Sequence, residues 1–243
     1  LVVPDELPTA IRFNPPRHRE SKKNNGAWPP LTMAEPYSRR SLHMSLRPPL
    51  LQTFLSQAEN AFGRCATSDA SRRSISSAFK ALNAEKQSSE RDAARLPVCD
   101  VWLSQALDLQ ALPDGLRILA EAFLAIEPQV HWRTRSGDQA NASATFEAGH
   151  ANAMIVGPGG IEPRTDVWIG ASLLAPNVRY PDHMHPPEET YLVLSTGEFS
   201  QNNGDWFAPG IGGSFYNPPG ILHAMKSGPA PLFAFWLLRA QEA

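Results

Sequence analysis

The sequence predicts a mainly β protein, a sandwich or barrel of short strands preceded by a helical N-terminal part. After Pro128, short runs rich in β-branched and aromatic residues are separated by Gly, Pro and Asn, which is typical of strands joined by turns. Before it, apolar residues recur at spacings of three and four, which is typical of amphipathic helices. With 243 residues, the chain is long enough to bury a sizeable core. We therefore expect a helical subdomain over residues 45–127 and a β-barrel over residues 128–243.

Residues 1–44 are expected to be a disordered leader, or an extension beyond the natural start of the chain. Nine of the 23 prolines lie in the first fifty residues, together with several arginines and lysines. Proline removes backbone donors from helices and sheets, and the segment offers little apolar surface to bury. We therefore leave it out of the predicted fold.

Four helices are expected in the N-terminal part. The first spans about residues 50–63, where the apolar residues share one face. The second covers residues 71–95, which are rich in Ala, Lys, Glu, Arg and Gln. Residues 101–109 form the third, and Asp114 is interpreted as the N-cap of the fourth. Together they predict a helical cap for the barrel.

Six strands are expected in the C-terminal part, each a short run between turn residues. They are Val130–Trp132, Ala151–Val156, Val167–Leu174, Tyr191–Leu194, Gly213–Tyr216 and Leu232–Leu238. Their number and spacing favour a closed or nearly closed β architecture.

Composition and motifs exclude several classes of function. The formal net charge of −2 argues against a nucleic-acid partner, and no run of about 18 apolar residues is present to span a membrane. Two cysteines cannot form a disulfide framework, so a reduced, cytoplasmic setting is expected. The chain lacks the glycine-rich phosphate loops and the nucleophile elbow of the common dinucleotide, NTP and hydrolase folds.

Three of the seven histidines lie close together in the β part. His183, His185, Glu189 and Tyr191 share one parity, so an unbroken strand would turn all four toward the barrel interior. A Gly- and Pro-rich turn then leads to His223. Neutral imidazoles with a carboxylate suit a divalent transition metal, namely Zn, Fe, Mn or Ni. The alternative is a hydrogen-bonded cluster that only supports the structure.

These two segments resemble the paired motifs of the cupin superfamily, HxH(x)3E and G(x)5PxG(x)2H. They depart from it in two places, since seven residues separate Glu189 from Gly197 and Ser227 stands where Asn is frequent. The predicted fold is therefore a cupin, a jelly-roll-like β-barrel capped by N-terminal α-helices. Cupins serve many reactions, so this resemblance gives a site more than an activity.

A narrower resemblance, over about residues 95–240, is to the cupin-type dimethylsulfoniopropionate (DMSP) lyases. It is carried by the run from His150 to Gly160, by the segment from Tyr180 to Tyr191 with its HxHxxxExY motif, and by residues 207–225. It implies a bacterial carbon–sulfur lyase that cleaves DMSP by β-elimination to dimethyl sulfide and acrylate. The four residues His183, His185, Glu189 and His223 would bind one metal ion, which would hold the substrate carboxylate. Tyr191 would then be the catalytic base.

The resemblance also places Tyr180 beside the substrate, which would be a small sulfonium molecule. A methylated sulfonium cation favours an aromatic wall, for which Trp168, Tyr216 and Trp236 are candidates together with Tyr180. His150 is interpreted as structural. Asp182 and Glu188 have the parity of residues that face solvent. The sequence does not determine the oligomeric state, and a homodimer is kept open.

Two other functions are open to a cupin with these ligands. One is an Fe(II) dioxygenase acting on a small organic acid or thiol, which oxygen uptake would reveal. The other is a ligand-sensing cupin without catalysis. It would need a DNA-binding helix-turn-helix, and residues 50–126 show no basic recognition helix.

Overall fold

The computed structural model describes residues 47–89, 92–137 and 139–240. The predicted leader, residues 1–44, lies outside the described residues. The helices are α1 (Pro49–Cys65), α2 (Asp69–Leu82), α3 (Pro97–Ala106), α4 (Asp114–Ile126) and the short α5 (Phe146–Gly149), with a 3-10 turn at Glu127–Gln129. The strands are β1 (Trp132–Arg133), β2 (His150–Val156), β3 (Val167–Leu174), β4 (Glu188–Val193), β5 (Glu198–Gln201), β6 (Ser214–Asn217), β7 (His223–Lys226) and β8 (Leu232–Arg239). None of the described helices is long and apolar enough to cross a membrane.

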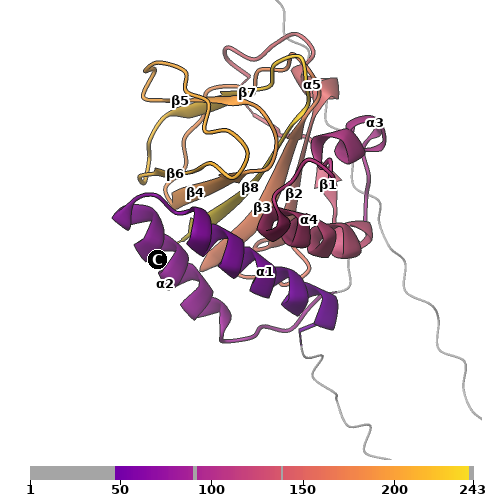
Figure 1. Ribbon diagram of the computed structural model, residues 1–243, viewed down its shortest axis with the longest axis vertical. Helices are drawn as coiled ribbons and strands as arrows, with labels where there is room; N and C mark the ends of the chain where they lie inside the picture. Colours follow the sequence, from indigo (N-terminus) through magenta and orange to yellow (C-terminus); the bar gives the residue numbers. More distant parts are fainter. Residues whose placement is uncertain (1–46, 90–91, 138, 241–243) are drawn as a thin grey trace, which may run out of the picture. The chain divides into compact units, whose positions relative to one another are not determined.

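The strands form two antiparallel sheets. The larger has the order β1-β2-β3-β8-β4-β6, and the smaller pairs β5 with β7. In Figure 1 the helices α1, α2 and α4 lie on one side of the larger sheet, while β5 and β7 lie on the other. The predicted mainly β architecture with a helical N-terminal part is therefore present.

The alternation of side chains along the strands separates two faces. On β2, β3 and β8 the odd-numbered side chains join the core formed with the helices, as Ile155, Ile169 and Phe235 do. On the other face, Leu174 of β3 and Ala234 of β8 belong to a second cluster with Phe199 of β5 and Met225 of β7. Helices and sheet share one hydrophobic core, in which the ring of Phe235 lies 5.2 Å from Phe123 of α4 and 5.6 Å from Phe54 of α1. Packing therefore continues across the boundary expected at residue 127.

Three helix predictions are wrong in detail. The third helix spans Pro97–Ala106 and not residues 101–109. The second helix ends at Leu82 instead of continuing to residue 95, although the following residues favour helix by composition. Asp114 is the first residue of α4 and not its cap, because Pro113 occupies the capping position. The Asp114 carboxylate instead pairs with Arg117 one turn later.

Strands β5 and β7 were not expected; both have only four residues, and several of these are polar.

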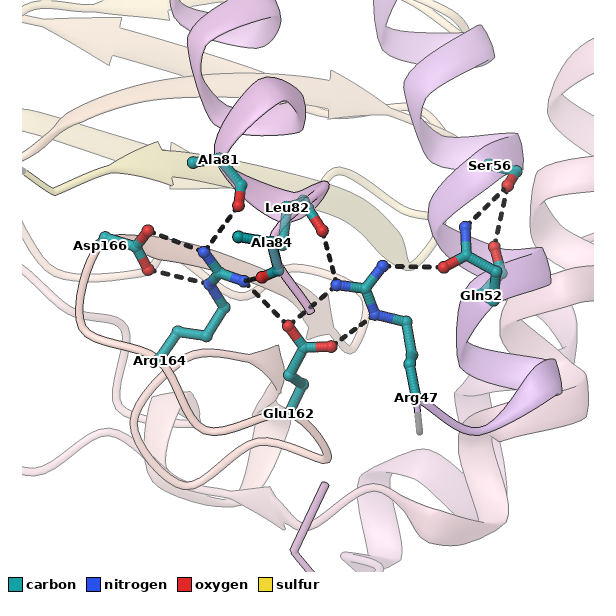
Figure 2. Close-up of polar contacts among 9 residues, drawn as sticks. All are labelled: Arg47, Gln52, Ser56, Ala81, Leu82, Ala84, Glu162, Arg164 and Asp166. Atoms are coloured by element: carbon teal, nitrogen blue, oxygen red, sulfur yellow. Dashed lines mark hydrogen bonds and ion pairs between the residues drawn. The ribbon is translucent and has the colours of Figure 1, made fainter. Parts of the chain in front are cut away.

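A buried ionic cluster, defined here as Arg47, Glu162, Arg164 and Asp166, joins the helices to the connection between β2 and β3 (Figure 2). The Glu162 carboxylate accepts hydrogen bonds from the guanidinium groups of Arg47 and Arg164. Both arginines also donate to backbone carbonyls at the end of α2, for example Arg47 to Leu82 at 2.7 Å. The cluster therefore satisfies carbonyl groups that the end of a helix leaves without partners.

Candidate active site

A cavity of about 410 Å³ opens on the sheet face opposite the helices. Seven of the predicted site residues line it, and they come from β3, β4, β8 and the segment before β4: Trp168, Tyr180, His183, His185, Glu189, Tyr191 and Trp236. A larger cavity of about 1050 Å³ lies elsewhere and is lined by none of the predicted site residues. The smaller cavity is therefore the candidate active site.

The side chains of His185 and Glu189, which line this cavity, converge with that of His223. Their possible ligand atoms all lie within 4.8 Å of one another. The Nε2 atoms of His185 and His223 are 3.4 and 3.2 Å from the same oxygen, Oε2 of Glu189. His183 lies next to this group, with its ring centroid 4.0 Å from that of His223. The structure thus brings all four predicted ligands together, with His183 outside the tightest group.

The hydrogen bonds of the three histidines fit a metal ion. In each ring Nδ1 faces a backbone carbonyl, namely that of Pro181, Pro187 or Ile221, at 2.9–3.0 Å. A carbonyl only accepts, so Nδ1 carries the proton and Nε2 of the neutral ring is left with a lone pair. Nε2 of His223 is buried without a hydrogen bond among the described residues. The Nε2 lone pairs of His185 and His223 point toward a carboxylate, which has no hydrogen to donate to them. A bound cation would interact favourably with the lone pairs and the carboxylate together.

The reason for this convergence differs from the predicted one. Strand β4 begins at Glu188, so His183 and His185 do not lie on an unbroken strand with Glu189. Pro186 and Pro187 lie between the two histidines and the start of β4, and proline has no backbone N–H to donate to the hydrogen bonds between strands. His183 is instead held opposite His223 by a pair of backbone hydrogen bonds of 3.0 and 2.9 Å. The shared parity was correct for Glu189 and Tyr191 alone.

Burial and neighbouring charges shift the pKa of His183, Glu189 and His185 in different directions. Burial, with the neighbouring His223, lowers the pKa of His183 to about 3, so its imidazole is neutral. Burial alone would raise the pKa of Glu189, but the adjacent His185 and His223 outweigh it and hold this pKa well below its usual range. Burial lowers the pKa of His185, but the Glu189 carboxylate more than offsets this, and the net shift is upward. The neutral ring of His183 and the ionised carboxylate of Glu189 are the forms that bind divalent metals, whereas His185 would have to lose its proton to do so.

Tyr191 is buried beside this cluster, with 3 % of its surface exposed. Its ring stacks on Phe215 at a centroid distance of 5.1 Å, which fixes its orientation. Burial raises its pKa well above the usual value, and the negative charge of Glu189 raises it further. A positive charge next to Glu189 would act in the opposite direction.

Three of the four candidate wall residues face the cavity, and one does not. Trp168, Tyr180 and Trp236 line it, whereas Tyr216 pairs with Thr190 and therefore lies on the other face of the sheet. Its hydroxyl donates to Glu188 Oε2 at 2.6 Å. The prediction for Tyr216 is wrong because the register places Phe215 and Asn217 on the cavity side, opposite Tyr191 and Glu189. Glu188, expected to face solvent, is half-buried by this contact.

Trp236 lies directly over Gly170 of the neighbouring strand. A Cβ atom at this glycine would come within 2.2 Å of the indole ring and 2.3 Å of the Ala153 carbonyl. We expect Gly170→Ala to lower the free energy of unfolding by about 1–3 kcal/mol, because the ring and backbone must shift. Gly63→Ala is the matched control, since nothing lies within 4 Å of its position in α1. Urea unfolding measures both, and equal stability of Gly170→Ala and the wild type would contradict the packing.

Sequence reasoning did not identify several polar residues of the cavity. Asn152 and Ser172 line it, as do Arg133 and Arg135 on the segment that begins with β1. The available signal was a polar residue at an even-numbered position of an otherwise apolar strand. His150 is structural as predicted: its Nε2 accepts from the backbone N–H of Arg135 at 2.7 Å, and its Nδ1 faces the Phe146 carbonyl.

The profile of the dimethylsulfoniopropionate lyase family matches residues 70–234, which is more than half of the chain. The chain belongs to the DMSP lyase family. This family membership confirms the predicted class of carbon–sulfur lyase. The match begins in α2 and ends in β8, so it includes every predicted site residue except Trp236.

Individual relatives of this lyase family agree with the match. The dimethylsulfoniopropionate lyase DddQ of Ruegeria pomeroyi strain DSS-3 is 27 % identical over 149 residues, which cover 59 % of this chain and 73 % of that protein. The crystal structure of DMSP lyase DddQ from the same organism superposes with a TM-score of 0.60 at 22 % identity, covering 80 % of this chain and 93 % of that one. A chain from the crystal structures of the DMSP lyases RdDddP and RnDddQII gives 0.59 at 23 % identity, covering 79 % and 92 %. These likenesses confirm the predicted helix-capped cupin fold.

Proposed function

We propose that this protein cleaves DMSP by β-elimination, giving dimethyl sulfide and acrylate, and that Tyr191 removes the proton. The observation that carries the proposal is the position of Tyr191, which is buried in the same cavity as the histidine and glutamate cluster of a DMSP lyase family member. The substrate would be a small sulfonium molecule that fits a cavity of about 410 Å³.

The four residues His183, His185, Glu189 and His223 would hold a divalent transition metal, Zn, Fe, Mn or Ni. Such an ion would supply Lewis-acid stabilisation of the substrate carboxylate as negative charge develops on it. The neutral imidazole of His183, the ionised carboxylate of Glu189 and the Nε2 atom of His223, which is buried without a hydrogen bond among the described residues, support this assignment.

Tyr191 would take the proton from the carbon next to the carboxylate at its phenolate oxygen. The C–H electron pair then forms the C=C bond while the C–S bond breaks, and dimethyl sulfide leaves as a neutral molecule. Because burial and Glu189 keep the pKa of Tyr191 high, the phenolate requires a cation beside Glu189. The aromatic rings of Trp168 and Trp236 would face the methylated sulfur.

The direct test is release of dimethyl sulfide into the headspace above purified, metal-loaded protein supplied with DMSP. We expect gas and equimolar acrylate with no oxygen uptake, and loss of both products after chelation. Oxygen consumption would favour the dioxygenase chemistry instead. The absence of gas from protein with a full complement of metal would contradict the proposal.

Replacement of a ligand tests the metal site without measuring turnover. We expect Glu189→Gln to lower the metal affinity by at least about 100-fold, because it removes the charge that Nε2 of both His185 and His223 approach. Metal content after dialysis against a graded chelator measures this loss. Glu188→Gln is the matched control, since its carboxylate contacts Tyr216 on the other face of the sheet. Equal metal retention by the two variants would show that Glu189 is not a ligand.

A further inference from the structure

A chain of hydrogen bonds runs along the cavity wall from Trp236 to Tyr180. Nε1 of Trp236 donates to Oγ of Ser172 at 3.1 Å, and Ser172 Oγ donates to Oδ1 of Asn152 at 2.6 Å. Nδ2 of Asn152 then donates to the Tyr180 hydroxyl oxygen at 2.9 Å. Three strands, β8, β3 and β2, thus contribute to the orientation of one phenol.

The direction of this chain is set at its tryptophan end. An indole N–H can only donate, so Ser172 accepts there and its own hydrogen must find another partner. Ser172 is 3 % exposed, and Asn152 Oδ1 is its one acceptor among the described residues. A flipped Asn152 amide would leave the serine hydrogen buried without an acceptor, which is costly. The amide therefore presents its NH₂ group to Tyr180.

The hydrogen bond from Asn152 also determines where the hydrogen of the Tyr180 hydroxyl can point. Since Asn152 donates to this oxygen, the hydrogen points elsewhere, and none of the described residues accepts it. Tyr180 lines the cavity together with Tyr191 and three of the predicted ligands, and 5 % of the surface of this residue is exposed. A buried phenol held in this way is a hydrogen-bond donor available to a ligand in the cavity.

We propose that Asn152, with Ser172 and Trp236 behind it, is a positioning residue that fixes Tyr180 as a hydrogen-bond donor to the carboxylate of the substrate. The inference rests on the proposed function in taking that substrate to be a carboxylate with a cationic sulfonium end. The ionised oxygens of such a ligand are the acceptors that the Tyr180 hydroxyl lacks. The indole N–H of Trp236 is occupied by Ser172, so only the face of this ring is left for the sulfonium group.

A double-mutant cycle separates positioning from packing. Asn152→Leu keeps the approximate volume of the side chain and removes its amide, and we expect KM for DMSP to rise about 10-fold with kcat changed less than about threefold. Tyr180→Phe removes the donor and is expected to raise KM at least as much. If Asn152 acts through Tyr180, adding Asn152→Leu to Tyr180→Phe costs nothing further. Multiplied losses in the double variant, or no effect of Asn152→Leu, would overturn the inference.

Binding of acrylate, measured by calorimetry on the metal-loaded protein, gives a readout independent of turnover. We expect its dissociation constant to rise in the same ratio as KM in Asn152→Leu, and to be unchanged in Ser214→Ala. This control removes another buried serine hydroxyl, on β6, that has no hydrogen-bond partner among the described residues. If Asn152→Leu weakens acrylate binding but the wild type releases no dimethyl sulfide, the proposed function is contradicted and the positioning role is supported. A wild type that binds no acrylate would overturn the positioning role.

Discussion

Tyr191→Phe is expected to lower kcat for DMSP cleavage by about 10³-fold and to leave the metal content unchanged. The variant lacks only the oxygen that would accept the proton, and a positioned general base contributes about 10²–10⁴-fold. The ring itself is held by stacking on Phe215 and by contact with Phe199, so the cavity should keep its shape. The measurement is single-turnover release of dimethyl sulfide at saturating substrate, with metal content determined on the same sample.

Tyr216→Phe is the matched control for this experiment. It removes the same atom from a tyrosine on the strand next to β4, but on the opposite face, where the hydroxyl contacts Glu188. We expect its kcat to stay within about twofold of the wild type, because surface changes away from the cavity have small effects. Retention of most turnover by Tyr191→Phe would show that another group is the base. A comparable loss in Tyr216→Phe would show that the loss in Tyr191→Phe is not specific to the cavity.

These two tyrosines show what the sequence could and could not predict about the site. Tyr191 follows Glu189 by two residues on one strand, so parity within the strand places both on the cavity side. Tyr216 belongs to a separate strand, and its face depends on the register between β4 and β6. That register is set by packing between segments some 25 residues apart, which a single sequence does not reveal.

The four candidate metal ligands could be picked out from the sequence, but the reason given for their convergence was only partly correct. Spacing gave the four residues, but His183 and His185 reach the cluster through a bend at Pro186 and Pro187 and not along a strand. The spacing of the motif identifies the residues that converge, but it does not show the backbone path that brings them together. In the same way, the even-numbered polar residues Asn152 and Ser172 were visible in the sequence. The direction of the hydrogen bond between them, however, is set by Trp236, which lies on a strand more than sixty residues away in the sequence.

The buried ionic cluster had no local signal in the sequence. Arg47 and Glu162 are 115 residues apart, and each lies in a segment that reads as a loop. The apolar periodicity of α1, by contrast, identified its buried face, including Phe54 and Phe62, from the sequence alone. Periodic elements were therefore predictable, whereas ion pairs between distant loops were not.

Glu162→Gln is expected to lower the free energy of unfolding by about 3–5 kcal/mol. The Glu162 side chain is fully buried and accepts from Arg47 and Arg164, so the amide would leave the buried Arg47 without its carboxylate partner and Arg164 with Asp166 alone. In a domain of this size the change corresponds to a fall in Tm of about 10 °C. Urea unfolding of protein with matched metal content measures the loss.

The control is Glu121→Gln, in an exposed pair with Arg117 on α4. Solvent screens such an exposed pair, so it contributes little to stability and this variant should unfold almost like the wild type. The contrast matters because both variants remove one carboxylate charge and keep the side-chain volume. Only Glu162 also orders arginines that cap the end of α2, which packs against β8 and β4 beneath the cavity. If the two variants lose equal stability, the cluster is not what joins the helices to the sheet.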